Sequence, residues 1–458
     1  MHEEKMKQGT DFIQSIQESP MSEADLRVVP LLLQGIKKLE LGEEVQAQDI
    51  FRDAVKQSPD SFKACYLLGR TALAQENFTE AQEALGNALA LSPENIEVKY
   101  LIAYVHALQD MVEEAAGELL EILEKCPDFI DAYYDCGVAL QLLGRYEEAI
   151  EIFEKRLTFS PDFETALMCA MTYEMLQDFE NTEKYYAQAL ALDPENIMVI
   201  ESRGKTLLEL ERYEEAMADF SLALKMEPGS PDAMCGRGQT YFHLGEIEKA
   251  ECDFRETVEL DPENMIAWSM IGQIKLYQEQ YAEALEALEK ALELDPELLV
   301  YDFRASAKRG LGDLEGALAD IKLAIEYEPE NADYLIDLGS ILAEMDQMDE
   351  ALKVFNQVVS LQKSMDAYRF RGLLFMERLE YEKAISDFDE AIRLGAENAD
   401  VFLSRGEALY QLGEREKALD DFQRAKETVE ADGDIEFAKK CDHFIANLKK
   451  FEDGVGNF

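Results

Sequence analysis

The amino-acid sequence predicts an all-α solenoid built from tandem pairs of helices. Three observations predict it: prolines recur at a fixed interval, a small residue recurs between them, and apolar residues lie at helical spacing within each interval. A period this regular indicates a repeat array, in which stacking buries the apolar face that one unit cannot bury alone. Nine of the 12 prolines stand 33 or 34 residues apart, at Pro59, Pro93, Pro127, Pro161, Pro194, Pro228, Pro262, Pro296 and Pro329.

Each unit is predicted to contain two amphipathic helices. With each proline as position 32 of a 34-residue unit, apolar residues fall at positions 4, 7, 8 and 11 and again at 17, 20, 24 and 27. Two helices approach closely only where a side chain is nearly absent. We therefore expect the small residue at position 8 to face the alanine at position 20, and the large residue at position 24 to fill the space toward the next unit. Position 8 is small in all twelve units, at Gly35, Gly69, Ala103, Gly137, Ala170, Gly204, Gly238, Gly272, Ala305, Gly339, Gly372 and Gly406.

The turns between units carry their own signals. Segments such as Asp193–Asn196 and Asp261–Asn264 have the sequence Asp-Pro-Glu-Asn. Proline cannot continue a helix, and asparagine is a good N-cap for the next one. The second helix of each unit is therefore expected to end just before the proline.

This pattern of a small residue at 8, alanine at 20, an aromatic residue at 24, alanine at 27 and proline at 32 resembles the tetratricopeptide repeat family. Arg156 and Thr257 depart from it at position 27. The resemblance implies a right-handed superhelix of helix-turn-helix repeats, with a concave groove lined by the first helix of each pair. It covers residues 28–432 in twelve repeats, at about 28–61, 62–95, 96–129, 130–163, 164–196, 197–230, 231–264, 265–298, 299–331, 332–364, 365–398 and 399–432.

Segments outside the repeats stand at both ends. Residues 1–27 are polar, with a candidate short helix around Phe12, Ile13 and Ile16. Residues 433–458 are predicted to form a capping helix and a short tail. One face of that helix is apolar and the opposite face is basic, with Phe437, Cys441, Phe444, Ile445, Leu448 and Phe451 on the first and Lys439, Lys440, Lys449 and Lys450 on the second.

The chain is strongly acidic. It has 44 Lys plus Arg against 96 Asp plus Glu, a net charge of −52, yet its hydrophobic fraction of 47% is that of a folded protein. This charge argues against binding to nucleic acid or to anionic membrane surfaces and favours basic protein partners. Adaptation to a saline cytoplasm is the alternative source of the acidity.

The sequence favours a cytoplasmic protein. The first residues lack a cationic start followed by an apolar run, and nowhere do 18 apolar residues follow one another. The seven cysteines are scattered and include no pair at CxxC spacing, which is typical of reduced thiols.

No motif predicts an enzyme, a cofactor or a metal site, and an enzyme is the third hypothesis. Gly204, Lys205 and Thr206 lack the preceding glycine of a phosphate-binding loop. Cys136 and Cys169 occupy position 7 and are expected to be core thiols rather than nucleophiles. The four histidines are isolated, and the acidic residues at position 2 have the place of helix caps, as at Asp131.

Positions 2, 5, 6, 9 and 12 are expected to face the groove. The early repeats place aromatic and aliphatic residues beside an arginine there, which is typical of binding hot spots. From the fourth repeat on the groove is acidic, with Asp135, Glu174, Glu201, Asp302, Asp337 and Glu407. The alternatives are that these aromatics pack against adjacent first helices or are covered by residues 1–27. The candidate binding residues are Tyr66, Arg70, Tyr100, Leu101, Tyr104 and Tyr134, with a second patch at Arg369 and Phe370.

The sequence thus favours a non-catalytic protein-protein interaction scaffold or adaptor that binds a basic or amphipathic peptide or helix in its groove. The alternative is a co-chaperone or assembly factor that shields client proteins. Co-chaperone members of the family that grip acidic chaperone tails use asparagine and lysine on their first helices. No asparagine stands at position 2, 5, 6 or 9 in any repeat.

Overall fold

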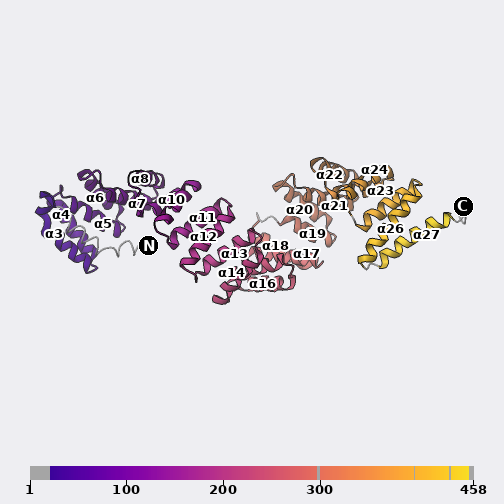
Figure 1. Cartoon of the computed structure of the whole chain (residues 1–458), viewed down its shortest axis with the longest axis horizontal. Coiled ribbons are helices and arrows are strands. Elements are labelled where there is room, and N and C mark those ends of the chain that lie inside the picture. Colours follow the sequence, from indigo (N-terminus) through magenta and orange to yellow (C-terminus); the bar gives the residue numbers. More distant parts are fainter. Residues whose placement is uncertain (1–20, 297–299, 397, 433–434, 453–458) are drawn as a thin grey trace. The chain divides into compact units, whose positions relative to one another are not determined.

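A computed structural model describes residues 21–296, 300–396, 398–432 and 435–452. Within these residues every regular element is an α-helix, from α3 to α27 (Figure 1), so the predicted fold class is confirmed. The candidate helix around Phe12, Ile13 and Ile16 lies outside the described residues. So do the tail after residue 452 and the side chains of Lys449, Lys450 and Phe451.

The chain forms two compact units, Met1–Thr240 and Tyr241–Phe458. The first unit contains α3 (Glu23–Glu40), α4 (Glu44–Gln57), α5 (Phe62–Ala74), α6 (Phe78–Leu91), α7 (Ile96–Leu108), α8 (Val112–Lys125), α9 (Asp131–Leu142), α10 (Tyr146–Phe159), α11 (Phe163–Met175), α12 (Phe179–Leu192), α13 (Ile197–Glu209), α14 (Tyr213–Met226) and most of α15 (Pro231–His243).

The second unit contains α16 (Ile247–Leu260), α17 (Met265–Tyr277), α18 (Tyr281–Leu294), α19 (Tyr301–Gly310), α20 (Leu314–Tyr327), α21 (Ala332–Glu344), α22 (Met348–Leu361), α23 (Met365–Glu377), α24 (Tyr381–Arg393), α25 (Ala399–Gln411), α26 (Arg415–Asp432) and α27 (Ile435–Glu452).

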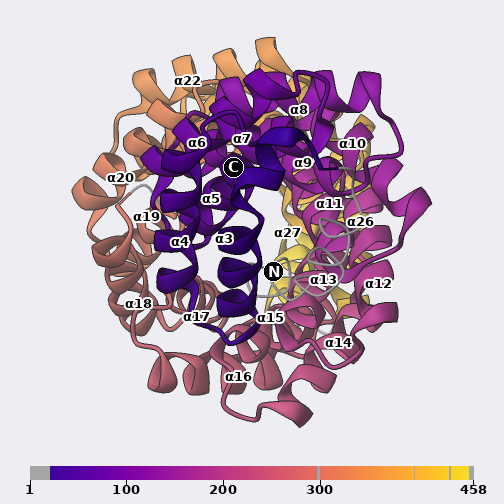
Figure 2. The same ribbon diagram turned by 90° about the vertical axis from the view of Figure 1, so that its left-hand side faces the viewer.

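Consecutive helices pack as the first and second helix of a repeat. In the first unit, α8, α10 and α12 lie on the outer side and α9, α11 and α13 lie on the inner side (Figure 2). In the second unit, α18 and α20 lie outside α17 and α19. The last helix, α27, packs on α26 and buries Cys441 and Leu448, as expected of a capping helix.

The first helix begins earlier than the repeat pattern indicates. Ser22 caps α3, since its hydroxyl accepts the amide of Asp25 at 3.1 Å while the Asp25 carboxylate accepts the amide of Ser22. Asp25 is buried and also accepts the hydroxyl of Ser61 at 2.7 Å and the amide of Lys63 at 3.2 Å. Burial alone would raise the pKa of Asp25, but these hydrogen bonds outweigh it and lower that pKa. The carboxylate therefore ties α3 to the start of α5.

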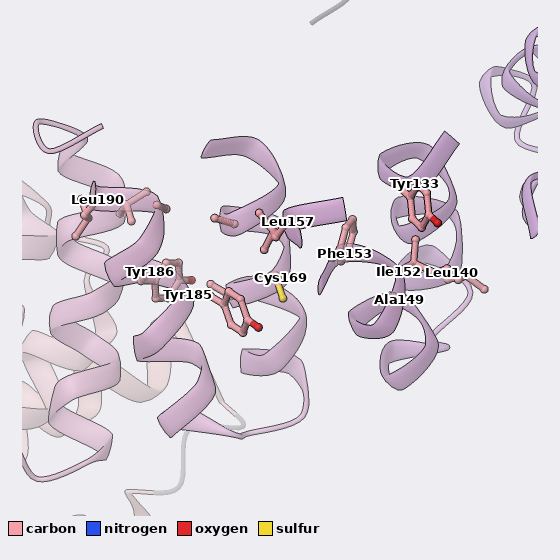
Figure 3. Close-up of a cluster of buried hydrophobic side chains, with 14 of the residues drawn as sticks. Tyr133, Leu140, Ala149, Ile152, Phe153, Leu157, Cys169, Tyr185, Tyr186 and Leu190 are labelled. Carbon is pink, nitrogen blue, oxygen red and sulfur yellow. The ribbon is translucent and has the colours of Figure 1, made fainter. Parts of the chain in front are cut away.

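The glycine at position 8 makes room for the ring at position 24 of the same repeat. A Cβ added to Gly339 would lie 2.7 Å from the ring of Phe355, and one added to Gly406 would lie 2.7 Å from the ring of Phe422. The expectation that this glycine faces the alanine at position 20 is therefore wrong about its nearest partner. The ring at position 24 also reaches the next repeat, because Phe220 lies against Gly236 as well as Gly204. Figure 3 shows this layer of the core around Phe153.

In several repeats a buried ion pair joins the two helices. An arginine at position 7 forms two hydrogen bonds with an aspartate at position 23, as Arg304 Nε and Nη2 do with Asp320 at 2.8 and 2.6 Å. The expectation of an apolar residue at position 7 is wrong for these repeats, because the arginine is neutralised by the aspartate across the pair. The same pairing is made by Arg203 with Asp219, Arg371 with Asp387 and Arg405 with Asp421.

Three turns between repeats are held by an aromatic donor at position 4. Trp268 Nε1 donates to the carbonyl of Pro262 at 3.0 Å, and the hydroxyl of Tyr133 donates to the carbonyl of Pro127 at 3.0 Å. The hydroxyl of Tyr301 likewise donates to the carbonyl of Pro296 at 2.7 Å. These bonds fix the starts of α17, α9 and α19 against the proline turns that precede them.

The turn within a repeat passes through one residue in the left-handed region. This residue is position 15, and it is glycine in some repeats, such as Gly144 with φ 71°, and an ordinary residue in others, such as Glu76 with φ 55° and Leu379 with φ 60°. A non-glycine residue in this region costs about 1–2 kcal/mol. The geometry of this turn is therefore kept even where the residue type does not favour it.

Candidate functional site

The first helices line the inner side of each unit and touch one another directly. In the first unit α5 contacts α3 and α7, and α9 contacts α7 and α11. In the second unit α23 contacts α21 and α25. A side chain at position 5 therefore lies between two first helices. Its exposure depends on how closely those two helices pack.

Tyr66, on α5, faces α7 and is only 4% exposed. Its hydroxyl donates to the carboxylate of Glu97 in the next repeat, and Arg70 Nη1 donates to the same hydroxyl at 3.4 Å. Arg70 also pairs with Glu97 at 3.8 Å. Burial raises the pKa of Tyr66, so its hydroxyl stays protonated. Tyr66, Arg70 and Glu97 form one polar link between neighbouring repeats.

Tyr100 repeats this arrangement one step along the chain. It is 8% exposed, and its hydroxyl donates to Asp135 Oδ2 at 2.5 Å. Its ring meets Phe129 edge-on at 5.2 Å and stacks on Tyr104 at 6.3 Å. Tyr104 itself is only half-buried, so the buried tyrosine holds an accessible one in place.

Leu101 and Tyr134 are the other accessible members of this set. Leu101 is half-buried and packs against the cores on both sides of α7. Tyr134 is half-buried between Phe153, whose ring centroid is 6.3 Å away, and the guanidinium of Arg156, 5.5 Å away. Tyr100, Leu101 and Tyr104 thus lie on α7 and Tyr134 lies on α9, with Asp131 and Asp135 near the hydroxyl of Tyr100.

Arg369 and Phe370 form a separate group on α23 in the second unit. The guanidinium of Arg369 lies 4.1 Å from the centre of the Phe370 ring and pairs with Asp366 at 3.2 Å and Asp400 at 3.3 Å. Phe370 stacks on Phe355 at 5.8 Å. Sequence reasoning named Arg369 and Phe370 but missed both carboxylate partners, Asp366 and Asp400, although the spacing of position 5 to position 2 of the next repeat is the same as for Tyr66 and Glu97.

The acidic residues of the inner side fall into two classes. In the first unit they are engaged: Glu174 accepts the hydroxyl of Tyr186 at 2.8 Å, and Glu201 accepts that of Ser230 at 2.6 Å. In the second unit, burial raises the pKa of Asp302, that of Glu407, and that of Asp337 to about 6. These three carboxylates are half-buried without a cation in contact among the described residues.

Replacing Asp337 with asparagine should stabilise the second unit at neutral pH by about 2 kcal/mol, since one pKa unit corresponds to about 1.4 kcal/mol and Asp337 is only partly buried. The pKa of Asp337 in the folded wild-type protein is raised from 3.8 to about 6. Below pH 4 this carboxyl group is protonated and costs the wild-type protein no stability, but the free energy of unfolding falls as the pH rises through 6 and the group ionises. The difference between the two proteins in urea unfolding should therefore vanish near pH 4. Glu350→Gln, at an exposed position of α22, is the control. A difference independent of pH would contradict this account.

Among the residues that the structure describes, no three His, Cys, Asp or Glu side chains converge as metal ligands would. All seven cysteines are free thiols, and Cys136 and Cys169 are buried as predicted. Burial raises the pKa of each of these two to about 12, which leaves them protonated and unreactive. Among the described helices, none combines the length and the apolar character needed to cross a membrane.

Models of the tetratricopeptide repeat match most of the chain. The matched residues are 38–103, 72–128, 130–163, 170–231, 201–265, 266–298, 304–367 and 371–434. The matches fall on the helix pairs described above.

Relatives and solved structures share the repeats. Human tetratricopeptide repeat protein 13 is 28% identical over 124 residues, 26% of this chain and 14% of that protein. Human protein O-mannosyl-transferase TMTC1 is 25% identical over 119 residues, again 14% of its length. The chain therefore matches only a small part of each of these relatives. The crystal structure of the APC/C hetero-tetramer Cut9-Hcn1 covers 93% of this chain and 96% of its own, at 14% identity and a TM-score of 0.49.

Proposed function

Because the chain belongs to the tetratricopeptide repeat family, we propose that it is a non-catalytic scaffold whose inner side binds a basic or amphipathic segment of a partner protein. Proteins of this family generally mediate protein-protein interactions through such arrays. The repeats occupy most of the chain, and the described residues outside them form the start of α3 and the last helix, α27, which packs on α26.

The observation that carries this proposal is the fixed aromatic surface on α7 and α9. Leu101, Tyr104 and Tyr134 are half-buried and accessible, and the buried Tyr100 holds Tyr104 through stacking and its own bond to Asp135. A surface whose side chains are already ordered loses little entropy on binding. Aromatic anchors of this kind supply most of the energy of protein interfaces. Arg70, which is half-buried and donates to the hydroxyl of the buried Tyr66, extends this surface onto α5.

Charge supports a basic or amphipathic partner. Asp131, Asp135 and Glu97 surround the aromatic surface, and the whole chain carries a net charge of −52. Opposite charges on the partner raise the association rate and fix its orientation. The second patch, at Arg369 and Phe370, offers a cation over an aromatic ring flanked by two aspartates, and we include it in the proposed binding surface.

A synthetic amphipathic helix of leucine and lysine should bind the full chain, whereas the same helix with glutamate in place of lysine should not. The affinity should fall steeply between low and moderate salt, because charges are screened over about 10 Å at ~0.1 M. Replacing Leu101 and Tyr104 with alanine should weaken binding of the lysine peptide by about tenfold, the effect of losing one anchor of ~1.4 kcal/mol. Fluorescence anisotropy of the labelled peptide measures all three effects.

The control removes apolar surface elsewhere without changing the charge. Leu91 and Leu192 are exposed at the ends of the second helices α6 and α12, so a Leu91→Ala and Leu192→Ala variant leaves the first helices of the inner side intact. Equal binding by this control and by the Leu101 and Tyr104 variant would mean that the acidic field attracts any cation. The aromatic surface would then not be the site.

The alternative, a factor that shields unfolded clients, makes a different prediction. Such a factor suppresses the aggregation of an unrelated unfolded protein, and a scaffold with a defined peptide site does not. The proposed function also fits a reducing compartment such as the cytoplasm, where the seven free thiols would persist.

A further inference from the structure

Three neighbouring first helices carry an accessible apolar band on the inner side of the first unit. Each of α7, α9 and α11 presents one apolar side chain at position 9 and another at position 13, one turn further along the helix. The exposed fraction reaches 72% at Leu142 and 55% at Met175. The apolar band consists of Tyr104, Leu108, Val138, Leu142, Met171 and Met175.

The apolar band is confined to these three repeats. Position 9 holds Arg70 on α5 and Lys205 on α13, so the band ends at a charged residue on both sides. Lys205 is itself paired with Asp232 at 3.0 Å. Within the band α7 contacts α9, and α9 contacts α11. Packed helices lie about 8–10 Å apart, so the band is about 20 Å long from α7 to α11.

A row of carboxylates runs beside the apolar band. Position 2 of the same three helices holds Glu97, Asp131 and Glu164, and all three are exposed. Position 2 comes seven residues before position 9, which is about 10 Å along the helix. Glu97 pairs with Arg70, whereas Asp131 and Glu164 have no ion pair among the described residues. This acidic row therefore keeps most of its charge.

The other charges near the band do not cancel that of the acidic row. Arg156, whose guanidinium lies 5.5 Å from the ring of Tyr134, is already paired with Asp162 at 3.1 Å. Glu174, at position 12 of α11, accepts the hydroxyl of Tyr186 at 2.8 Å. Burial raises the pKa of Tyr186, so this donor is neutral and leaves the charge of the carboxylate in place. The border of the apolar band is thus negative and favours a cationic partner.

We propose that the apolar band receives an amphipathic α-helix of a partner protein, which crosses α7, α9 and α11 and directs the lysines or arginines of one flank at the acidic row. This inference rests on the proposed function and names the conformation and the register of the partner. Seven residues of an α-helix rise about 10.5 Å, which is close to the spacing of neighbouring first helices. The partner therefore places one heptad on each repeat, and its apolar stripe is about 15 residues long.

Other backbone conformations match the apolar band less well. In an extended strand, residues on one face are about 6.6 or 13 Å apart, and neither distance equals the spacing of the first helices. A polyproline helix repeats its face every ~9.3 Å but presents a single row of side chains. The band is two side chains wide, at positions 9 and 13, as the stripe of an amphipathic α-helix requires.

The test compares two leucine and lysine peptides of identical composition and about 18 residues, long enough to cross the band. One has leucine at heptad spacing and the other alternates leucine with lysine. We expect the full chain to bind the heptad peptide at least about tenfold more tightly, since only that peptide reaches all three helices with one face. In NMR spectra, the methyl groups of Met171 and Met175 should shift saturably. The methyl group of Met226, on the second helix α14, should not.

A matched pair of variants tests the apolar band itself. Leu142→Gln with Met175→Gln changes two exposed side chains and should weaken binding of the heptad peptide by about tenfold. Leu91→Gln with Leu192→Gln makes the same change on the second helices α6 and α12 and should leave binding unchanged.

A second matched pair tests the acidic row. Asp131→Asn with Glu164→Gln should reduce the dependence of binding on salt, because two of the carboxylates that face the lysines are removed. Glu147→Gln with Glu180→Gln removes the same charge from exposed positions of α10 and α12 and should preserve that dependence.

The inference is overturned if the two peptides bind the wild-type chain equally, or if the variant at Leu142 and Met175 binds the heptad peptide as tightly as the wild type. In either case the heptad peptide still binds, and the proposed function stands. Failure of both peptides to bind the wild-type chain would refute the proposed function as well, so the two failures are distinguishable.

Discussion

Replacing Asp320 with alanine will destabilise the second unit by about 3–5 kcal/mol, the usual cost of breaking a buried ion pair from one side. The Asp320 side chain is only 3% exposed and accepts both hydrogen bonds of the Arg304 guanidinium. Its second oxygen also pairs with Lys308 at 2.8 Å. The substitution therefore leaves two largely buried cations on α19, Arg304 and Lys308, without their common partner.

Urea unfolding of the full chain, followed by circular dichroism, measures this loss. The matched control replaces both partners, Arg304 with leucine and Asp320 with valine. This is the pair that the next repeat already uses at the same positions, Leu338 and Val354. We expect this double variant to recover most of the lost stability, because an apolar pair of similar volume usually replaces a buried ion pair at little cost. An alanine variant as stable as the wild type would mean that Asp320 does not hold the two helices together.

Replacing Gly339 with alanine will destabilise the same unit by about 3 kcal/mol, the upper end of the cost of overpacking a core. The new Cβ would lie 2.7 Å from the ring of Phe355, which is almost fully buried and stacks on Phe370. The ring cannot move away without displacing Phe370. The better helix propensity of alanine offsets about 1 kcal/mol of a larger steric cost.

A second substitution should relieve this clash. The third repeat carries alanine at position 8 and leucine at position 24, Ala103 and Leu119, and both are fully buried. Combining Gly339→Ala with Phe355→Leu should therefore cost about 1–3 kcal/mol less than the sum of the two single changes. Unfolding of the four proteins in a double-mutant cycle gives this coupling directly. Strict additivity would show that Gly339 and Phe355 do not share one space.

The repeat architecture is predictable from sequence because each helix pair obeys a local code. Position 8, position 24 and the proline turn recur with the same spacing, and Cys136 and Cys169 are buried because position 7 faces the pair. The buried ion pairs also have a signature in the sequence. In three of them the arginine stands directly before the glycine at position 8, at Gly204, Gly372 and Gly406, and the aspartate follows the arginine by 16 residues. They were missed because a pattern sought only in apolar residues excludes charged ones.

The candidate site is less predictable because it depends on contacts between repeats. Whether a residue at position 5 faces the open inner side or the neighbouring first helix depends on the rotation from one repeat to the next. That rotation is set by the packing between repeats, and the sequence of a single repeat does not determine it. Tyr66 and Tyr100 are therefore buried links, while Tyr104, four residues after Tyr100, remains accessible. The apolar band likewise draws its residues from three helices of three repeats.

The left-handed residue at position 15 also constrains how the chain can change in length. Position 15 keeps the same left-handed conformation from repeat to repeat, so the turn has a fixed length. An inserted residue would therefore rotate the second helix by about 100° and turn its alanine and its aromatic ring away from the core. The spacing from position 8 to position 20 is accordingly 12 residues in every repeat, as from Gly137 to Ala149 and from Ala170 to Thr182. In the 33-residue interval from Pro161 to Pro194 the missing residue lies between repeats: only three residues join α10 to α11, against four between α12 and α13. Insertions and deletions are thus tolerated between repeats and excluded within them.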